Sequence, residues 1–218
     1  MTLKLYFHPF SSYSQKALIA FYELGMAFEP HVIADPAEEP SRTLGERWPM
    51  RRFPMLLDGD RQVVEASCIV EYLDLLQGGS RLLPRDPQAA LDVRMWDRFF
   101  DLHVMSAVQA VVYDALRPEG DRDPFGVRQA QDRLETAYRW LEGHIAGRPW
   151  AAGETFSLAD CAAAPALFYA DWTRPIDPSL QGVWAYRRRL LARASVARAV
   201  DEARPFRQFF PLGAPDRD

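Results

Sequence analysis

Hydrophobic and polar residues alternate over residues 3–7, LKLYF, and this period of two is typical of a β-strand. Pro9 ends the strand, and the spacing of apolar residues then becomes helical. The helical positions are Ala17, Ala20, Phe21 and Leu24. A serine pair, Ser11 and Ser12, can cap the start of this helix, and Gly25 can end it. The pattern therefore predicts a strand that leads directly into a helix.

The next segments continue this mixed pattern as far as residue 80. Residues 27–33, AFEPHVI, predict a second strand, and the polar stretch 35–52 predicts a loop with one helical turn near RTLGERW. Two apolar runs flank Asp-Gly-Asp at 58–60, which is a strong signal of a β-hairpin. From Ser67 the spacing is helical again until the glycines at 78–79. The order β, α, β, hairpin, α is that of a thioredoxin-like layer.

Strand signals vanish after a Pro-containing linker at residues 80–86, and only helical spacing remains. A long helix is predicted first, because two apolar stripes run along it. The stripes are Leu91, Met95, Phe99, Leu102, Met105 and Val112, and Val93, Trp96, Phe100, Ala107 and Val111. Further helices are predicted over 127–145, from Ser157 onward, and within 179–203. We therefore predict an α/β thioredoxin-like domain over residues 1–80 and an all-α domain over 87–218.

Composition and charge narrow the classes of function. The net charge is −4, with 26 basic and 30 acidic residues and no basic stripe, so we expect no nucleic acid partner. The sequence has no apolar run long enough for a membrane span and no signal-peptide pattern, which predicts a cytoplasmic protein without membrane contact. Cys68 and Cys161 lie in apolar helical patterns, so we expect buried, inert thiols, and the four histidines lack metal-ligand spacing, so we expect no metal.

Four short motifs occur in a fixed order along the chain: SSYS at 11–14, RRFP at 51–54, EASCIVEYL at 65–73 and FSLAD at 156–160. Together with the predicted domain order, they resemble those of the soluble, cytosolic-type glutathione S-transferases, in particular the bacterial serine-type members of the zeta-like and theta-like classes. The resemblance implies the GST fold, glutathione as co-substrate and a homodimer. In FSLAD the serine and aspartate have the spacing of a capping box, which serves folding.

By this resemblance, Ser11 donates a hydrogen bond to the glutathione sulfur, with Ser12 as the second choice. A free thiol is mostly protonated at neutral pH, and a hydroxyl donor together with the N-terminus of a helix stabilises the thiolate. The alternative is that both serines only cap the helix. Phe10 is expected to line the cavity for an electrophile.

The RRFP motif implies the contacts for the middle and the glycyl end of glutathione. Pro54 is expected to be cis, so that the backbone of Phe53 pairs with the cysteinyl unit like an added strand. Arg52 is expected to hold the glycyl carboxylate, with Arg51 as the alternative; a solvated loop charge is the simpler interpretation of both.

The EASCIVEYL motif implies contacts for the glutamyl end. Glu65 is expected to accept from the ammonium group, and the backbone N–H of residue 66 to meet the carboxylate. Ala66 stands where the family usually has serine, which removes one hydrogen bond to a charged group. Ser67 either compensates for that loss or only caps the helix.

For the second substrate we expect a pocket between the domains, against the long helix. Phe100 and His103 share one face of that helix with Ala107, although a structural interdomain histidine is the simpler interpretation of His103. Asp97 and Asp101 either approach a partner subunit's glutathione or form ion pairs with arginines on the same helix, Arg94 and Arg98.

The implied activity is that of a detoxification enzyme, in which the glutathione thiolate attacks a small hydrophobic electrophile. One alternative is a glutathione-dependent cis-trans isomerase similar to maleylacetoacetate isomerase, which uses the same serine. The other is a non-catalytic GST-fold binding protein, which the Ala66 departure makes credible.

Overall fold

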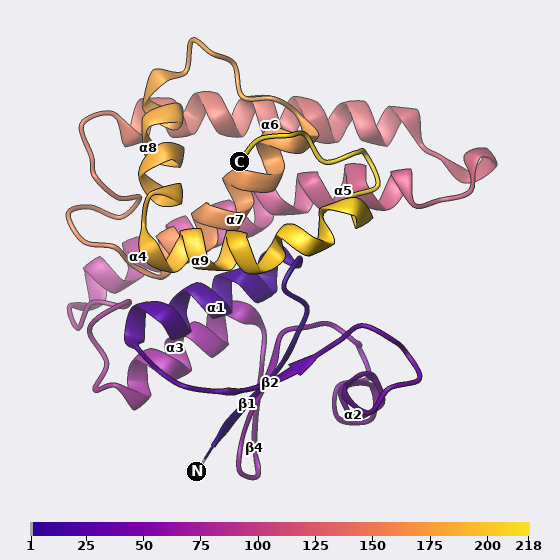
Figure 1. Ribbon diagram of the computed structural model, residues 1–218. Helices are drawn as coiled ribbons and strands as arrows, with labels where there is room; N and C mark the ends of the chain where they lie inside the picture. Colours follow the sequence, from indigo (N-terminus) through magenta and orange to yellow (C-terminus); the bar gives the residue numbers. More distant parts are fainter. Residues whose placement is uncertain (1) are drawn as a thin grey trace.

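A four-stranded sheet forms the base of the N-terminal domain in the computed structural model, which describes residues 2–218 (Figure 1). The strands lie in the order β2-β1-β3-β4. Strand β1 pairs with β2 in parallel and with β3 antiparallel, and β3 and β4 form the predicted hairpin. Their bounds are β1 Leu3–Phe7, β2 Glu29–Val32, β3 Met55–Asp58 and β4 Arg61–Val64.

Because side chains alternate along β1, this strand contributes apolar residues to both faces of the sheet. Leu5 and Phe7 point to one face and join the main core with α1 and α3, whereas Tyr6 points to the other face and packs near Leu44 of α2. The three helices are α1 Ser12–Leu24, α2 Glu39–Arg47 and α3 Ala66–Leu76. The single helical turn predicted around 42–48 is thus a helix of nine residues.

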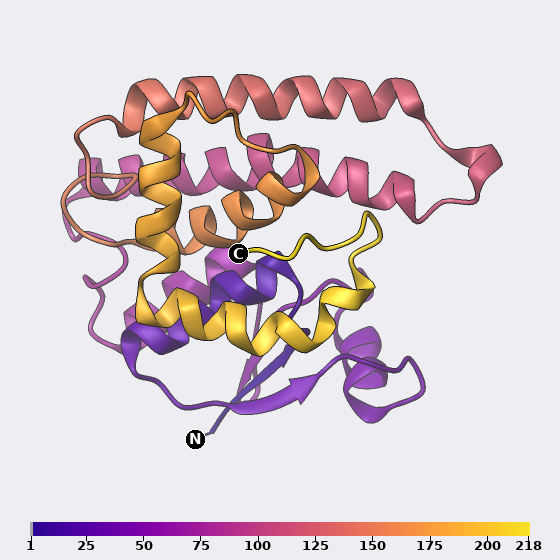
Figure 2. The same ribbon diagram turned by 45° about the horizontal axis from the view of Figure 1, so that its top comes forward.

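The C-terminal domain is entirely helical, and α7 lies at its centre (Figures 1 and 2). Every residue of α7 is buried, including Pro165, and the predicted capping box opens it, because the Asp160 carboxylate accepts from the Ser157 N–H at 2.9 Å. The helices are α4 Pro87–Phe99, α5 Ser106–Ala115, α6 Pro124–Ile145, α7 Leu158–Thr173, α8 Gln181–Leu191 and α9 Ala194–Ala203, with the π segment η1 Phe100–Met105 and the short 3₁₀ turns η2 Glu119–Asp121 and η3 Arg204–Phe209.

The predicted long helix is continuous but not uniform. Helix α4 passes through the π segment η1 into α5 without a break. A π segment has more residues per turn than an α-helix, so it rotates the residues that follow it relative to a regular helical pattern. Faces predicted from a single period across residues 91–112 are therefore offset after Phe99.

The two cysteines differ in exposure. Cys161 is buried in α7, where burial raises the pKa of its thiol well above the usual value. Cys68 is exposed, so the prediction that both thiols are buried is wrong for this residue. It lies on the solvent side of α3, whose inward face is formed by Ile69, Val70 and Leu73.

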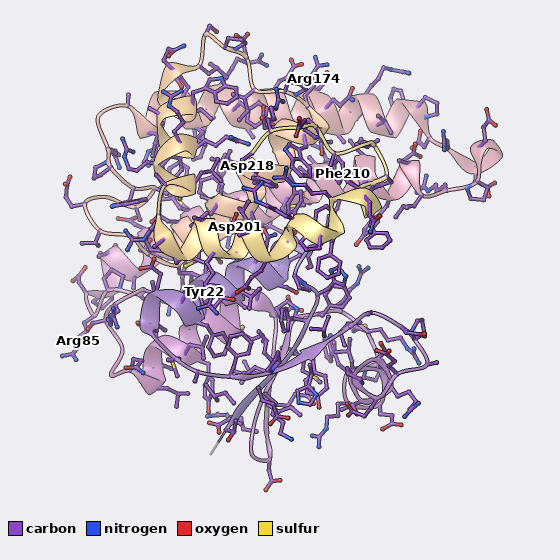
Figure 3. All side chains as sticks on the ribbon, in the orientation of Figure 1. Tyr22, Arg85, Arg174, Asp201, Phe210 and Asp218 are labelled. Atoms are coloured by element: carbon purple, nitrogen blue, oxygen red, sulfur yellow. The ribbon has the colours of Figure 1, made fainter. Side chains whose placement is uncertain are left out.

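Helix α1 joins the two domains. It packs against α3 on one side and against α7 and α9 on the other. Tyr22 of α1 lies beside α9 and donates a hydrogen bond to Glu202 at 2.5 Å (Figure 3). None of the helices in residues 2–218 has both the length and the apolar character needed to cross a membrane.

Candidate functional site

Two neighbouring cavities lie at the boundary between the domains. The first, about 370 Å³, is polar and is lined by residues of both domains, among them Arg51, Arg52, Glu65, Arg98 and Asp101. The second, about 250 Å³, is mainly apolar, and its lining includes Phe10, Met105, Val108, Val112, Tyr169 and Phe210. Four residues line both cavities: Ser11, Phe53, Gln109 and Tyr113. The cavities therefore adjoin one another at these four side chains.

Ser11 is the N-cap of α1. Its Oγ accepts a hydrogen bond from the Ser14 N–H at 3.3 Å. Because this bond uses a lone pair, the hydroxyl hydrogen of Ser11 is free to point elsewhere. Ser12 is buried, and of the two cavities it lines only the apolar one.

The loop before α1 is fixed by contacts with α7. Gln15 donates to the Pro9 carbonyl at 3.1 Å and to the Tyr169 hydroxyl at 3.0 Å. That hydroxyl in turn donates to the Phe10 carbonyl at 2.8 Å. Burial raises the pKa of Tyr169, so it remains a neutral donor. These bonds hold Phe10 and Ser11 against the C-terminal domain.

The segment 51–54 lines the polar cavity together with Ser11. The peptide bond between Phe53 and Pro54 is cis, as the resemblance implied. Arg51 has a positive φ of 52°, and both Arg51 and Arg52 line the polar cavity. Arg52 reaches across the cleft, where its Nη1 donates to the Tyr113 hydroxyl at 3.0 Å.

Glu65 and Ala66 lie together at the polar cavity, at the N-terminus of α3. Glu65 is exposed, has a φ of 68° and makes no side-chain capping bond. Ser67 is not the cap of α3, because the N-cap is Glu65, and Ser67 does not line the polar cavity. It donates to Asp97 Oδ2 at 2.8 Å and accepts from the Lys16 ammonium at 2.8 Å.

A charge cluster with a buried centre and an exposed edge at Arg98 adjoins the polar cavity. We define it as Lys16, Ser67, Asp97, Arg98 and Asp101. The Lys16 Nζ lies 2.5 Å from Asp97 Oδ1 and 2.8 Å from Asp101 Oδ2, and Arg98 Nη2 lies 2.6 Å from the same Asp101 oxygen. Burial raises the pKa of Asp101, although Lys16 opposes that shift. The cluster joins α1, α3, α4 and η1, and Arg98 and Asp101 extend it to the cavity wall.

Part of this cluster was predicted. The ion pairs of Asp97 and Asp101 with Arg98 are observed, whereas Arg94 pairs with Glu71 of α3 instead. Lys16 was missed. Lys16 precedes the inward-facing Ala20 by four residues and so shares its face of the helix, which is the signal that would have indicated a buried lysine.

The structure does not bring Phe100 and His103 to the cleft. Phe100 is fully buried in the core of the C-terminal domain and lies beside Trp96 and Tyr186. His103 is exposed and lines a separate groove with Phe99 and Trp140. Both residues belong to the π segment, where the predicted α-helical face does not apply.

Comparison with known proteins identifies the family. The family profile described as glutathione S-transferase, N-terminal domain, matches residues 5–81, and the profile for the C-terminal domain matches residues 110–189. The chain belongs to the glutathione S-transferase family.

The relatives of this chain are distant from it in sequence but close to it in fold. A probable glutathione S-transferase of Nicotiana tabacum is 27% identical over 71% of the chain, and the match spans 65% of that relative, less than two thirds of its length. A glutathione S-transferase of Methylobacillus flagellatus, solved with glutathione bound, is 25% identical with a TM-score of 0.81 over 91% of this chain and 98% of its own. Another glutathione S-transferase, from Methylobacterium radiotolerans, was solved in complex with glutathione sulfonate. It is 26% identical with a TM-score of 0.78, and the match covers 92% of this chain and 95% of its own.

Most of the residues that the sequence predicted for the site line one or both of the two cavities. Those at the polar cavity are Ser11, Arg52, Phe53, Pro54, Glu65 and Ala66; those at the apolar cavity include Phe10, Ser11 and Ser12. Sequence reasoning missed Tyr13, Trp48, Gln109 and Tyr113, and also the C-terminal residues Phe209, Phe210 and Pro211. Tyr13 lies within the SSYS motif but received no role there, whereas the others lie outside the four motifs, and only the packing of the two domains brings them together.

Proposed function

We propose that this chain is a glutathione transferase, which binds glutathione in the polar cavity and an electrophile in the apolar cavity. The observation that carries the proposal is that Ser11 lines both cavities. A thiol beside Ser11 lies where the contents of the two cavities meet. Attack of its thiolate on a bound electrophile requires that proximity.

Ser11 is the proposed donor to the thiol. Its oxygen accepts from the Ser14 N–H, so the same hydroxyl can cap α1 and donate its hydrogen to sulfur. The N-terminus of α1 adds a partial positive charge that also favours the thiolate. The capping and activating roles, which the sequence presented as alternatives, are compatible in one side chain.

The polar cavity supplies complementary charges for glutathione. Arg51 or Arg52 is the proposed partner of the glycyl carboxylate, and the backbone of Phe53 the partner of the cysteinyl unit. For the glutamyl end we propose Glu65 as acceptor from the ammonium and the backbone N–H of Ala66 as donor to the carboxylate.

The apolar cavity favours a small hydrophobic electrophile over the charged substrate of an isomerase. Phe10 lines this cavity, and Val108 and Val112 of α5 contribute apolar side chains to it, whereas Phe100 and His103 do not. Aromatic rings surround Phe10, with Tyr169 and Phe210 in edge contacts at 5.4 and 6.4 Å between centroids. Such a lining stabilises an apolar or aromatic ligand.

We also propose a homodimer. Four large apolar side chains are about half exposed or more on α4, η1 and α6: Leu91, Met95, Leu102 and Trp140. Large apolar side chains that are left exposed on several neighbouring helices are typical of a protein interface.

Calorimetric titration with glutathione tests the proposed function, with Ala66→Ser as the matched variant. We expect saturable binding to the unaltered protein, and tighter binding by the variant, because the added hydroxyl supplies a hydrogen bond to a charged group worth about 1.5 to 3 kcal/mol. A screen of hydrophobic electrophiles then measures thioether formation. Absence of binding at millimolar glutathione in both proteins would contradict the transferase and favour a non-catalytic GST-fold protein.

A further inference from the structure

A tight turn between β1 and α1 carries Phe10 and Ser11 to the two cavities. Pro9 and Phe10 form the turn, which is closed by a bond from the Ser11 N–H to the His8 carbonyl at 3.0 Å. A second bond crosses it, because the Phe10 N–H donates to His8 Nδ1 at 3.1 Å. A side chain that accepts from the backbone two residues ahead fixes a turn in the way that an Asx-turn does. His8 therefore holds the segment that carries Phe10 and Ser11.

The imidazole ring of His8 is packed between the two domains. The Phe206 ring of η3 makes an edge contact with it at 4.7 Å between centroids, and the Phe53 ring lies at 6.5 Å. The His8 N–H donates to Ser14 Oγ at 3.3 Å, which ties the turn to the first turn of α1. His8 lines neither cavity, so it acts on them only through the turn that it holds.

The bond from Phe10 requires a neutral ring. A neutral imidazole accepts at one nitrogen and donates at the other, whereas the protonated ring donates at both. Protonation of His8 therefore places a second N–H against the Phe10 N–H and removes the acceptor that fixes the turn. Partial burial lowers the pKa of His8 below its usual value, so the ring is neutral and the bond is made at neutral pH.

The charged groups around His8 are engaged elsewhere. Arg51 and Tyr13 line the polar cavity, which His8 does not. The others on the surrounding elements form these pairs: Arg52 with Tyr113, Lys16 with Asp97 and Asp101, and Arg204 and Arg207 of η3 with Asp218. Within residues 2–218 no carboxylate forms an ion pair with His8, and burial is the cause of its lowered pKa.

We propose that His8 is a positioning residue whose neutral ring holds Phe10 and Ser11 in the geometry that glutathione binding and thiol activation require. This inference rests on the proposed transferase function. Protonation of His8 releases the Phe10 N–H, so the cleft loses this geometry as the pH falls. The acid side of the activity profile then reports a group of the protein as well as the glutathione thiol.

The test measures the affinity for S-hexylglutathione, which has no ionisable thiol and whose alkyl chain suits the apolar cavity. Calorimetry gives its dissociation constant from about pH 7.5 down to about pH 5, across the usual titration range of histidine. His8→Asn keeps an acceptor for the Phe10 N–H but does not titrate. His31→Asn is the matched control, because His31 pairs with Glu29 at 2.8 Å and lines neither cavity.

For the unaltered chain and His31→Asn we expect the dissociation constant to rise below about pH 6, approaching about tenfold for each further pH unit. His8→Asn should bind as tightly as the unaltered chain at neutral pH and stay nearly constant in acid. His8→Leu, which offers no acceptor, should bind weakly at every pH. The same acid rise in His8→Asn, pH-independent binding by the unaltered chain, or tight binding by His8→Leu would overturn the inference.

The NMR signal of the Phe10 amide reports the same bond without any ligand. We expect it to titrate with His8 in the unaltered chain and to stay constant in His8→Asn, and a constant signal in both would also overturn the inference. Failure of the unaltered chain to bind S-hexylglutathione at neutral pH would contradict the proposed function, and the amide titration would still decide whether His8 controls the turn.

Discussion

Ser11 shows how one side chain can serve both the fold and the chemistry. Its oxygen caps α1 through the Ser14 N–H, and the residue lines both cavities. Capping fixes the rotamer of the hydroxyl, so the hydrogen that is left for the thiol is already oriented. A pre-oriented donor stabilises developing charge without reorganisation during the reaction.

Ser11→Ala should therefore lower kcat by about one to two orders of magnitude. The affinity for glutathione, measured by calorimetry, should stay nearly the same, because the donor acts on the thiolate and not on glutathione as a whole. Loss of the cap should also reduce the free energy of unfolding by about 1 kcal/mol. Asp86→Ala controls for this effect: Asp86 caps α4 through the Ala89 N–H at 2.8 Å, away from both cavities. Full activity of Ser11→Ala would transfer the proposed role to Ser12.

At the scale of elements, α1 is held to the C-terminal domain by charge as well as by apolar packing. Lys16 is 1% exposed, and its ammonium is paired with two buried carboxylates, Asp97 and Asp101. Removal of one member of such a cluster leaves the others charged and unpaired in a low-dielectric interior.

Lys16→Met should therefore lower the free energy of unfolding by about 3 to 5 kcal/mol, measured by chemical denaturation. Lys4→Met is the matched control, since the Lys4–Glu29 pair is 3.8 Å apart and 45% exposed at both ends, and an exposed pair contributes about 1 kcal/mol or less. Equal effects of the two substitutions would show that the buried cluster does not hold the domains together.

At the scale of the whole molecule, the apolar surface on α4, η1 and α6 remains uncovered in a single chain. Leu91 and Met95 share one face of α4, Leu102 is exposed in η1, and Trp140 of α6 is stacked on Trp96 of α4 with 4.7 Å between ring centres. A second copy that covers this surface accounts for its exposure.

Sedimentation velocity at micromolar concentration should therefore give the mass of a dimer for the unaltered chain and that of a monomer for Met95→Glu, since the new carboxylate would be buried at the interface without a partner. Phe125→Glu, at the opposite end of α6 from Trp140, should remain dimeric although Phe125 is also exposed. A monomeric unaltered chain would contradict the proposal.

The sequence by itself determined the features that depend on neighbouring residues. The alternation in 3–7, the Asp-Gly turn at 58–60 and the capping box of Ser157 and Asp160 all appear in the structure as predicted. Each is a local matter of backbone geometry and of which side chains share a face. The motifs at 11–14, 51–54 and 65–66 likewise supplied most residues of the polar cavity.

Tertiary structure decided the rest. Phe100 and His103 lie in a π segment and line neither cavity, and a π segment changes which way the following side chains point without a clear trace in the hydrophobic pattern. Two polar contacts across the domain boundary join residues far apart in the sequence. The Lys16–Asp101 bond joins residues 85 positions apart, and the Arg52–Tyr113 bond joins residues 61 positions apart. Periodicity shows which face of an element is apolar, but only the packing of two domains determines which polar groups meet across their boundary.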